Sequence, residues 1–206
     1  MKKVSSAAER PCHEAILEAA QELLREHGYK RMTMDEVAAR ANLGKGTIYL
    51  YFDNKEDLAL SCIDQKNAVL RAHLKQIARS RKPVTERLEN LLKERVLARL
   101  KAVQGYTTGI DDLLFALRQQ LFIRREEYHH QEALLIAEVL VEGRMTGEFD
   151  VEEPYETAQA LVTATNSLMP YSLSPKELVE RVKVQQSIER LAPMLVRSLR
   201  NCSRVG

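Results

Sequence analysis

The chain has 206 residues, of which 45% are hydrophobic, 29% charged and 5% aromatic, and its formal net charge is +2. This balance is typical of a folded globular protein and excludes a disordered chain, while so small a charge does not by itself indicate a nucleic-acid partner. Only 8 glycines and 6 prolines occur, so we expect helices almost throughout.

Cysteine usage and the amino-terminal residues indicate a cytoplasmic protein. Cys12, Cys62 and Cys202 are far apart, so we expect neither a disulfide framework nor a zinc site. An oxidant-sensing thiol is the alternative to a buried, unreactive one. Polar residues follow residues 1–4 in place of a signal-peptide core, and no run approaches the ~18–20 apolar residues of a membrane span. We therefore expect no membrane partner.

The first predicted helix begins at Pro11 and ends near Gly28, a residue suited to the left-handed conformation that terminates helices. Its apolar residues recur at spacings of three and four, which is the pattern of one buried helix face. The residues of this predicted face are Ile16, Leu17, Ala20, Leu23, Leu24 and His27.

A second helix is expected to start at Thr33 and to end at Ala41. Thr33 and Glu36 have the spacing of a capping box, in which each side chain accepts a hydrogen bond from the other residue's backbone N–H. Further helices are expected over residues 45–52, about 53–81, 84–103, 110–122, about 126–144, 154–170 and 174–199. Pro193 should kink the last helix or split it in two. The predicted fold class is therefore all-α, with about nine helices.

Residues 34–51 have the spacing of a helix-turn-helix. Ala38 provides a small residue where two helices cross, and four positions later Asn42 tolerates the positive φ that the turn needs. Six positions further, Ile48 can fill the corner between the helices. Such a unit leaves the second helix free to enter a major groove ~12 Å wide.

The side chains expected to contact DNA are polar, aromatic or glycine residues on the second helix and at the starts of its neighbours. Thr47 can hydrogen-bond a base edge, whereas Tyr49 and Tyr51 can reach phosphate or sugar. Tyr49 can equally pack against the first helix of the pair. The predicted set is Thr33, Gly44, Lys45, Gly46, Thr47, Tyr49, Tyr51 and Lys55. The alternative for these residues is an ordinary solvated helical corner.

The remaining segments offer two weaker predictions. A small-molecule pocket needs apolar lining with sparse polar groups; the candidates are Tyr106, Phe115, Phe122, Tyr128, Asn166 and Met169. The last two helices carry more apolar positions than a monomer needs, which indicates a homodimer interface: Leu161, Leu168, Leu178, Val182, Ile188, Leu191, Leu195 and Leu199. The alternative for both sets is ordinary core packing.

Glu126, Glu127, His129 and His130 form a short acidic and histidine-rich cluster. Glu126 and His130 lie four apart on one helical face and could hold a metal ion. A solvated charged helix face explains the same residues, and we expect no metal site and no cofactor.

Several segments together resemble the TetR family of bacterial repressors. They are Ile16-Leu17-Glu18-Ala19-Ala20, Gly28-Tyr29, Thr33 to Ala38, Gly44-Lys45-Gly46-Thr47-Ile48-Tyr49-Leu50-Tyr51-Phe52 and Lys55-Glu56-Asp57-Leu58. The resemblance covers about the first sixty residues. Asn42 stands where the family usually has Gly, and Gly44 where a polar side chain is common, which leaves the operator sequence open.

The resemblance implies a three-helix, helix-turn-helix DNA-binding domain over residues 1–54. A larger helical body, residues 55–206, would bind an effector and dimerise. The expected function is that of a ligand-responsive regulator, a homodimer that represses from a palindromic double-stranded operator and is released by a largely apolar small molecule. The alternative is a DNA-binding or recruiting module without a small-molecule switch. No catalytic motif stands out, so we expect no enzyme.

Overall fold

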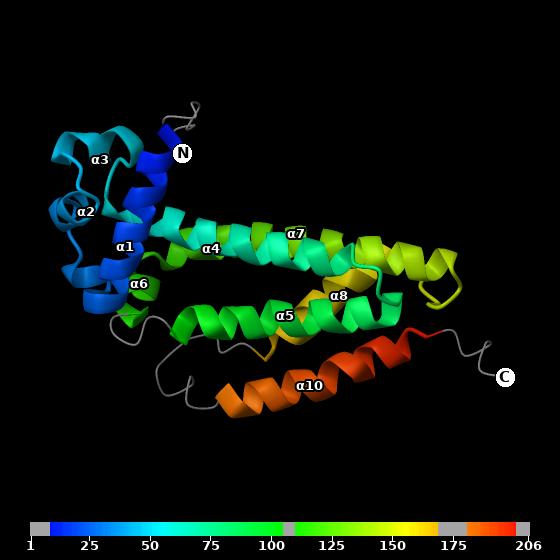
Figure 1. Ribbon diagram of the computed structural model, residues 1–206. Helices are drawn as coiled ribbons and strands as arrows, with labels where there is room; N and C mark the ends of the chain where they lie inside the picture. Colours follow the sequence, from blue (N-terminus) through cyan, green and yellow to red (C-terminus); the bar gives the residue numbers. More distant parts are fainter. Residues whose placement is uncertain (1–8, 105–109, 169–180, 201–206) are drawn as a thin grey trace. The chain divides into compact units, whose positions relative to one another are not determined.

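The computed structural model describes residues 9–104, 110–168 and 181–200. They contain nine helices (Figure 1): α1 (Glu9–Arg31), α2 (Met34–Arg40), α3 (Lys45–Tyr51), α4 (Lys55–Ala78), α5 (Val84–Gln104), α6 (Ile110–Ala116), α7 (Arg118–Met145), α8 (Pro154–Asn166) and α10 (Arg181–Ser198). Apart from helices, the described ranges hold one isolated bridge, between Phe149 and Arg200. The predicted all-α class is confirmed.

The chain forms two compact units, one from residues 1–67 and 103–122 and the other from residues 68–102 and 123–206. Three helices, α4, α5 and α7, therefore run from one unit into the other. None of the described helices combines the length and the apolar character that crossing a bilayer requires.

The first unit packs α1 against α2 and α6, and α2 against α3. Its buried apolar cluster contains residues from each of these helices and from the start of α4: Ile16, Leu17, Leu23, Leu24, Met32, Val37, Ala38, Ile48, Leu58, Cys62, Leu113 and Leu117. The predicted buried face of the first helix is thus confirmed except at His27, which is exposed just before the change of direction at Gly28. Gly28 adopts φ 75°, so the helix changes direction there, although helical residues continue to Arg31. Glycine tolerates this φ because it has no Cβ.

The second unit buries a separate apolar cluster contributed by α4, α5, α7, α8 and α10, with α8 packed on α10. Helix α7 ends in a left-handed turn at Gly147, φ 71°. The N–H of Glu148 donates to the carbonyl of Gly143 over 2.8 Å, which is the Schellman arrangement that satisfies terminal carbonyls. Gly143 itself faces the ring of Phe149, and a Cβ added there would lie 2.1 Å from a ring carbon.

The helix boundaries differ from the expected ones in two regions. Helix α8 ends at Asn166, before the expected end at residue 170. Instead of separate helices over residues 110–122 and 126–144, the break falls at Leu117, and α7 runs unbroken from Arg118 to Met145. Residues 122–126 contain no glycine or proline that would interrupt it. Pro193 lies inside α10 and does not split it.

Candidate nucleic-acid interface

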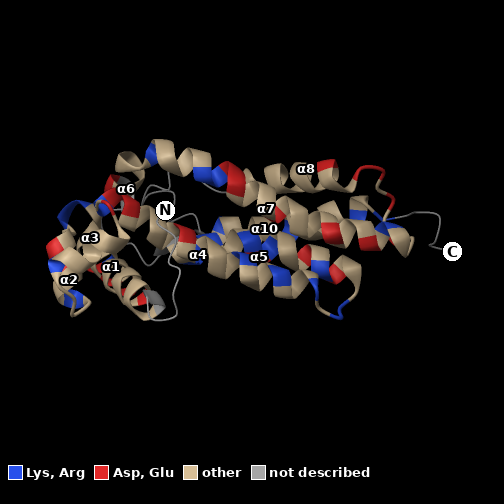
Figure 2. Ribbon diagram, turned by 90° about the horizontal axis from the view of Figure 1, so that it is seen from above, with Lys and Arg blue, Asp and Glu red and all other residues tan. Residues whose placement is uncertain are grey.

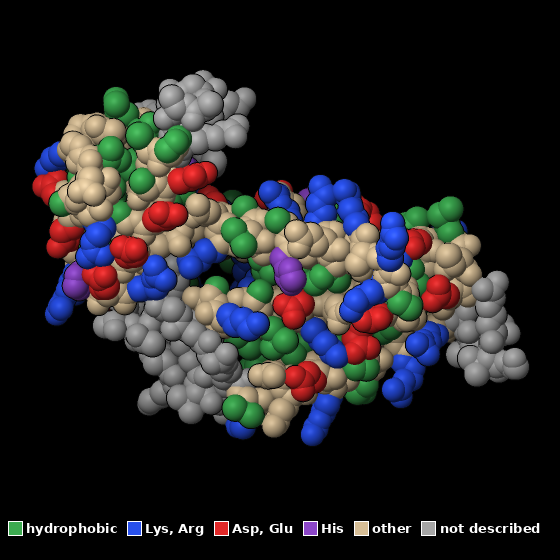
Figure 3. All heavy atoms as spheres, in the orientation of Figure 1, with side chains coloured by type: hydrophobic (Ala, Val, Ile, Leu, Met, Phe, Trp, Pro, Cys, Tyr) green, Lys and Arg blue, Asp and Glu red, His purple; other side chains and the backbone are tan. Residues whose placement is uncertain are grey.

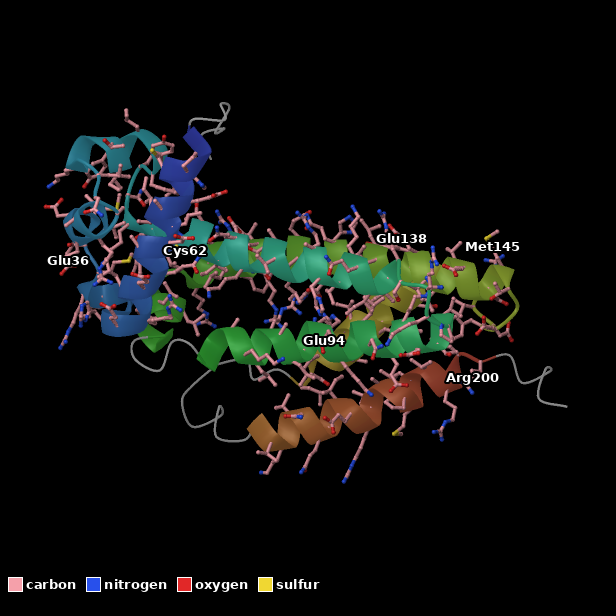
Figure 4. All side chains as sticks on the ribbon, viewed as in Figure 1. Glu36, Cys62, Glu94, Glu138, Met145 and Arg200 are labelled. Carbon is pink, nitrogen blue, oxygen red and sulfur yellow. The ribbon has the colours of Figure 1, made fainter. Side chains whose placement is uncertain are left out.

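The start of α2 has the predicted capping box. The backbone N–H of Glu36 donates to the hydroxyl of Thr33 over 3.2 Å, and the N–H of Thr33 donates to the carboxylate of Glu36 over 3.0 Å. Two backbone donors at the helix start are thereby satisfied, which fixes where α2 begins. Figure 4 labels Glu36 on this helix.

The turn between α2 and α3 is set by Asn42, whose φ is 54°. The N–H of Leu43 donates to the carbonyl of Ala38 over 3.0 Å, and that of Asn42 to the carbonyl of Ala39 over 3.2 Å, so the turn ends α2 in a Schellman arrangement. A non-glycine residue with positive φ is most often Asn or Asp. The prediction that Asn42 provides the left-handed turn residue is therefore confirmed.

Ile48 anchors α3 to α2. Its side chain is fully buried, as are Val37 and Ala38 across the helix pair, and the half-buried Ala41 and Leu43 pack against the same cluster. The predicted corner-filling role of Ile48 is confirmed. Because α3 has only seven residues, this one anchor sets which of its sides faces outward.

The outward side of α3 carries Lys45, Gly46, Tyr49 and Leu50. Tyr49 is 42% exposed and Leu50 is 71% exposed. Gly44 precedes the helix as its N-cap, and a Cβ added at Gly46 would meet no atom within 4 Å. The polypeptide itself therefore does not require glycine at position 46, which leaves room for a close external partner.

Thr47 and Tyr51 are half-buried rather than fully exposed. Tyr51 packs against the apolar cluster, and its ring centroid lies 6.1 Å from that of His13 on α1. The His13 ring in turn stacks on Phe52 at 5.2 Å. Tyr51 thus has a packing role in addition to any contact with DNA.

Lys45 is paired with an acidic residue of α2. Its amino group lies 2.8 Å from the carboxylate of Asp35, and both side chains are more than 60% exposed. The hydrogen bond to Asp35 raises the pKa of Lys45. Both signs of charge therefore occur on the helix-turn-helix (Figure 2), and the face shown in Figure 3 likewise mixes basic and acidic side chains.

Lys55, at the start of α4, is bound to the end of α1. Its amino group donates to the carbonyl of Tyr29 over 3.0 Å and to that of Lys30 over 3.4 Å, and it lies 4.5 Å from the centroid of the Tyr29 ring. A cation beside carbonyls at a helix end is stabilising. The side chain thus joins α1 to α4 within the first unit, a role that its position in the sequence did not reveal.

Leu50 is the residue of α3 that the sequence analysis missed. It lies four positions after Gly46, and helical periodicity therefore places the two on the same face. An exposed apolar side chain there is suited to contact with a thymine methyl group. Helical periodicity from Gly46 identifies its position, but its apolar side chain lacks the hydrogen-bonding groups of the predicted DNA contacts.

The predicted effector-binding residues lie in different settings. Phe115 is 86% exposed and Phe122 66% exposed, both in the first unit. In the second unit Tyr128 is half-buried, while the amide of Asn166 accepts a hydrogen bond from Arg95 over 2.8 Å. Tyr106 and Met169 lie outside the described residues.

The histidine-rich segment has protein partners. The ring of His130 lies 2.7 Å from the hydroxyl of Tyr155, and that of His129 lies 3.2 Å from the amide nitrogen of Asn166. Within the described ranges, no group of three or more His, Cys, Asp or Glu side chains gathers as a metal site would require.

The cysteines lie in different surroundings. Burial raises the pKa of the Cys62 thiol to about 12. Cys12 is half-buried, and Cys202 lies outside the described residues.

Comparison with known proteins adds independent evidence. Residues 16–62 match the model of bacterial regulatory proteins of the tetR family. The chain is 25% identical over 169 residues to the fatty acid metabolism regulator protein of Bacillus subtilis (strain 168), an alignment that covers 76% of this chain and 80% of that protein.

Two solved structures share the fold. A transcriptional regulator from Cytophaga hutchinsonii ATCC 33406 is 22% identical with a TM-score of 0.74, and the match covers 91% of this chain and 98% of that one. The transcriptional regulator FadR of Bacillus subtilis, solved in complex with stearoyl-CoA, is 20% identical with a TM-score of 0.55 and coverages of 89% and 95%. At these identities the structural similarity supports the fold alone.

Proposed function

Because this chain belongs to the tetR family of bacterial regulatory proteins, which are DNA-binding transcriptional regulators and not enzymes, we propose that it is a homodimeric repressor released from its operator by a small-molecule effector. The helix-turn-helix geometry carries this proposal. Ile48 holds α3 against α2 while Lys45, Gly46 and Tyr49 remain on the outside. A helix so presented is suited to the major groove.

We propose residues 1–54 as the DNA-binding domain and residues 55–206 as the effector-binding and dimerisation domain. The DNA contacts proposed are Thr33, Gly44, Lys45, Gly46, Thr47, Tyr49, Tyr51 and Lys55, to which the exposure of Leu50 adds one more. A regulator of this kind acts where the chromosome lies, so we infer a cytoplasmic location.

A palindromic operator requires two DNA-binding domains, and the exposed apolar residues of α10 support a dimer. Of the residues predicted for the interface, Val182 is 64% exposed in the single chain, whereas Leu161 and Ile188 are buried in its core and Leu168, Leu195 and Leu199 pack against that core. Leu178 lies outside the described residues. Met194, which was not predicted, is 63% exposed. Association with a second copy would remove the exposed Val182 and Met194 side chains from water. Light scattering of the full chain should give about 47 kDa, twice the chain mass of 23.5 kDa. A monomer at micromolar concentration would contradict binding of a palindromic operator by two copies of the chain.

Release by an effector needs a connection between the helical body and the helix-turn-helix. In the first unit α6 packs against α1, and α1 packs against α2. Residues 103–122 of the first unit begin with the end of α5 and finish with the start of α7. The remaining residues of both helices belong to the second unit. An effector that favours one arrangement of α5 and α7 would thereby act on α6, and the coupling between effector and operator would be reciprocal.

The proposed effector has a long apolar part. The similar structure from Bacillus subtilis contains stearoyl-CoA, and the similar curated protein is a regulator of fatty acid metabolism. The predicted lining residues Tyr106, Phe115, Phe122, Tyr128, Asn166 and Met169 remain candidates for contacts with it.

Selection from random duplex DNA tests the proposed function. The full chain should enrich a palindrome whose half-sites lie about one helical turn apart. The enriched duplex is then bound in the presence of a library of metabolites and apolar compounds, and at least one should release the protein. Failure to enrich any sequence would contradict the regulator, whereas enrichment without release would contradict only the effector switch.

A further inference from the structure

The second unit contains a buried ionic cluster that DNA binding does not use. Arg95 of α5 is fully buried, and its guanidinium donates to the carboxylate of Glu132 on α7, over 2.9 Å from Nε. Its other nitrogens donate to the carbonyl of Val162, the hydroxyl of Thr165 and the amide oxygen of Asn166 on α8. Arg95 is therefore held on all sides and joins three helices.

A second arginine shares the same carboxylate. Arg99 lies one turn after Arg95 on α5 and donates to both carboxylate oxygens of Glu132, over 3.2 Å to one of them, and to the carbonyl of Arg95. The side chain of Arg99 is 18% exposed, compared with 1% for Arg95 and 6% for Glu132. Arg99 is thus the member of the cluster that solvent can reach.

The cluster has more positive than negative charge. Among the described residues, Glu132 is the only carboxylate bonded to either guanidinium. Arginine retains its proton in proteins, so two cations share one anion in a largely apolar interior. Buried charges are normally paired, because leaving water costs several kcal/mol per ion.

His129 lies one turn before Glu132 on α7, and the excess of positive charge in the cluster affects its pKa. Burial and the charge of Arg99 lower its pKa to about 4, with smaller contributions from Arg95 and Arg125. Its ring, in contact with the amide of Asn166, is therefore neutral at pH 7 and adds no further cation. A neutral imidazole and an amide beside a cationic group are suitable hydrogen-bonding neighbours for an incoming anion.

We propose that the Arg95–Glu132–Arg99 cluster is a binding site for an anionic oxygen group, a carboxylate or phosphate, on the effector, with Arg99 as its donor. This proposal rests on the proposed function, since it describes the chemistry of the same effector. A second anion would balance the two guanidinium groups, which bind such oxygens in bidentate fashion. The apolar part of the ligand would pack against the buried apolar cluster of the same unit, to which Val96 and Leu100, the sequence neighbours of Arg95 and Arg99, belong. Figure 2 marks the basic residues of α5 in blue.

The test compares head groups on one apolar chain. Dodecanoate, dodecyl phosphate and 1-dodecanol are titrated calorimetrically into the full-length protein, below the concentrations at which they form micelles. We expect at least one anionic probe to bind about tenfold or more tightly than the alcohol. The comparison of dodecanoate with dodecyl phosphate distinguishes a carboxylate ligand from a phosphate ligand.

Arg99→Gln is the decisive variant, because it leaves a matched Arg95–Glu132 pair and so should retain the fold. It should reduce binding of the anionic probe to the level of the alcohol and leave alcohol binding unchanged. Arg99→Lys, which keeps the charge but not the planar geometry, should bind at an intermediate level. Arg79→Gln is the control, since Arg79 is an exposed arginine of the same unit that pairs with Glu138.

Three results would overturn the anion site: equal binding of alcohol and anions, unchanged anion binding by Arg99→Gln, or no binding of either anionic probe. Operator binding is measured on the same samples with the selected duplex. A protein that binds its operator and is released only by neutral compounds lacks the anion site but keeps the proposed function. A parent protein that selects no operator contradicts the proposed function itself.

Discussion

The amino group of Lys45 at the start of α3 lies 2.8 Å from the carboxylate of Asp35 on α2. The pair therefore places a negative charge beside a lysine that is proposed to contact DNA. Exposed pairs of this kind contribute little to stability, so their main effect here is on the local potential that a phosphate meets.

Asp35→Asn should strengthen operator binding. Removing the carboxylate frees Lys45 and removes a repulsion of phosphate, so we expect affinity to rise about 3- to 10-fold at low salt, with a salt dependence steeper by up to about one charge. Fluorescence anisotropy over a salt series measures both quantities. Glu18→Gln, an exposed carboxylate of α1, is the control. An equal gain in that variant would show that only net charge matters.

Gly46→Ala should have opposite effects on the stability of the protein and on its affinity for the operator. The added methyl group meets nothing within 4 Å in the protein, and alanine favours a helix over glycine by about 0.5–1 kcal/mol. The free energy of unfolding should therefore rise slightly, while operator affinity falls about tenfold or more if DNA approaches the backbone here. Urea unfolding and anisotropy are the measurements. Unchanged operator affinity would place Gly46 away from the DNA.

Lys55→Ala should affect both stability and binding. Loss of the bonds to the carbonyls of Tyr29 and Lys30 should lower the free energy of unfolding by about 1 kcal/mol. Loss of the proposed phosphate contact should make the salt dependence of operator binding shallower by about one charge. Lys30→Ala, which removes an exposed lysine of α1 and keeps the carbonyl that Lys55 binds, is the control. A stability loss with an unchanged salt slope would limit Lys55 to its structural role.

The lowered pKa of His129 predicts that the free energy of unfolding decreases in mild acid. Its folded-state pKa of about 4 lies below the ordinary 6.5, so between these values the unfolded chain binds more protons at this site. Stability should therefore be complete above pH 6.5 and fall as the pH decreases toward 4. After allowance for partial solvent exposure, we expect about 1 kcal/mol between pH 6.5 and 5.

His129→Gln should remove that part of the pH dependence, and urea unfolding at several pH values measures it. His27→Gln, which removes an exposed histidine, is the matched control. The pKa of Glu132 is also lowered, by Arg95 and Arg99, but its effect belongs to lower pH, below about 4.5. Identical profiles for His129→Gln and the parent would show that the histidine is not the group that titrates.

The helix-turn-helix was predictable from the sequence because its determinants are local. The capping pair Thr33 and Glu36 is three residues apart, and Ala38, Asn42 and Ile48 fall within one short segment. Each of these residues has a backbone or packing requirement that few side chains meet. Spacing alone therefore indicated the turn, the small crossing residue and the corner residue.

The buried ionic cluster, the contacts of Lys55 and the composition of the first unit depend on residues that are distant in the sequence. Arg95 bonds Glu132 and Thr165, which are 37 and 70 residues away, and nothing in the local pattern of α5 indicates either partner. The same is true of Lys55 and Tyr29, 26 residues apart. The inclusion of residues 103–122 in the first unit likewise follows from tertiary packing of α6 on α1, which helical periodicity does not specify.

The decisive measurement compares binding of the selected duplex with binding of the same duplex after one half-site is scrambled. We expect the intact palindrome to bind at least about 10³-fold more tightly than unrelated DNA, and scrambling one half-site to remove most of this preference. Thr47→Ala should weaken binding by about 1–3 kcal/mol and relax the preference at one base. Equal affinity for the intact, half-scrambled and unrelated duplexes, with equal salt dependence, would contradict a pair of α3 helices that read an operator.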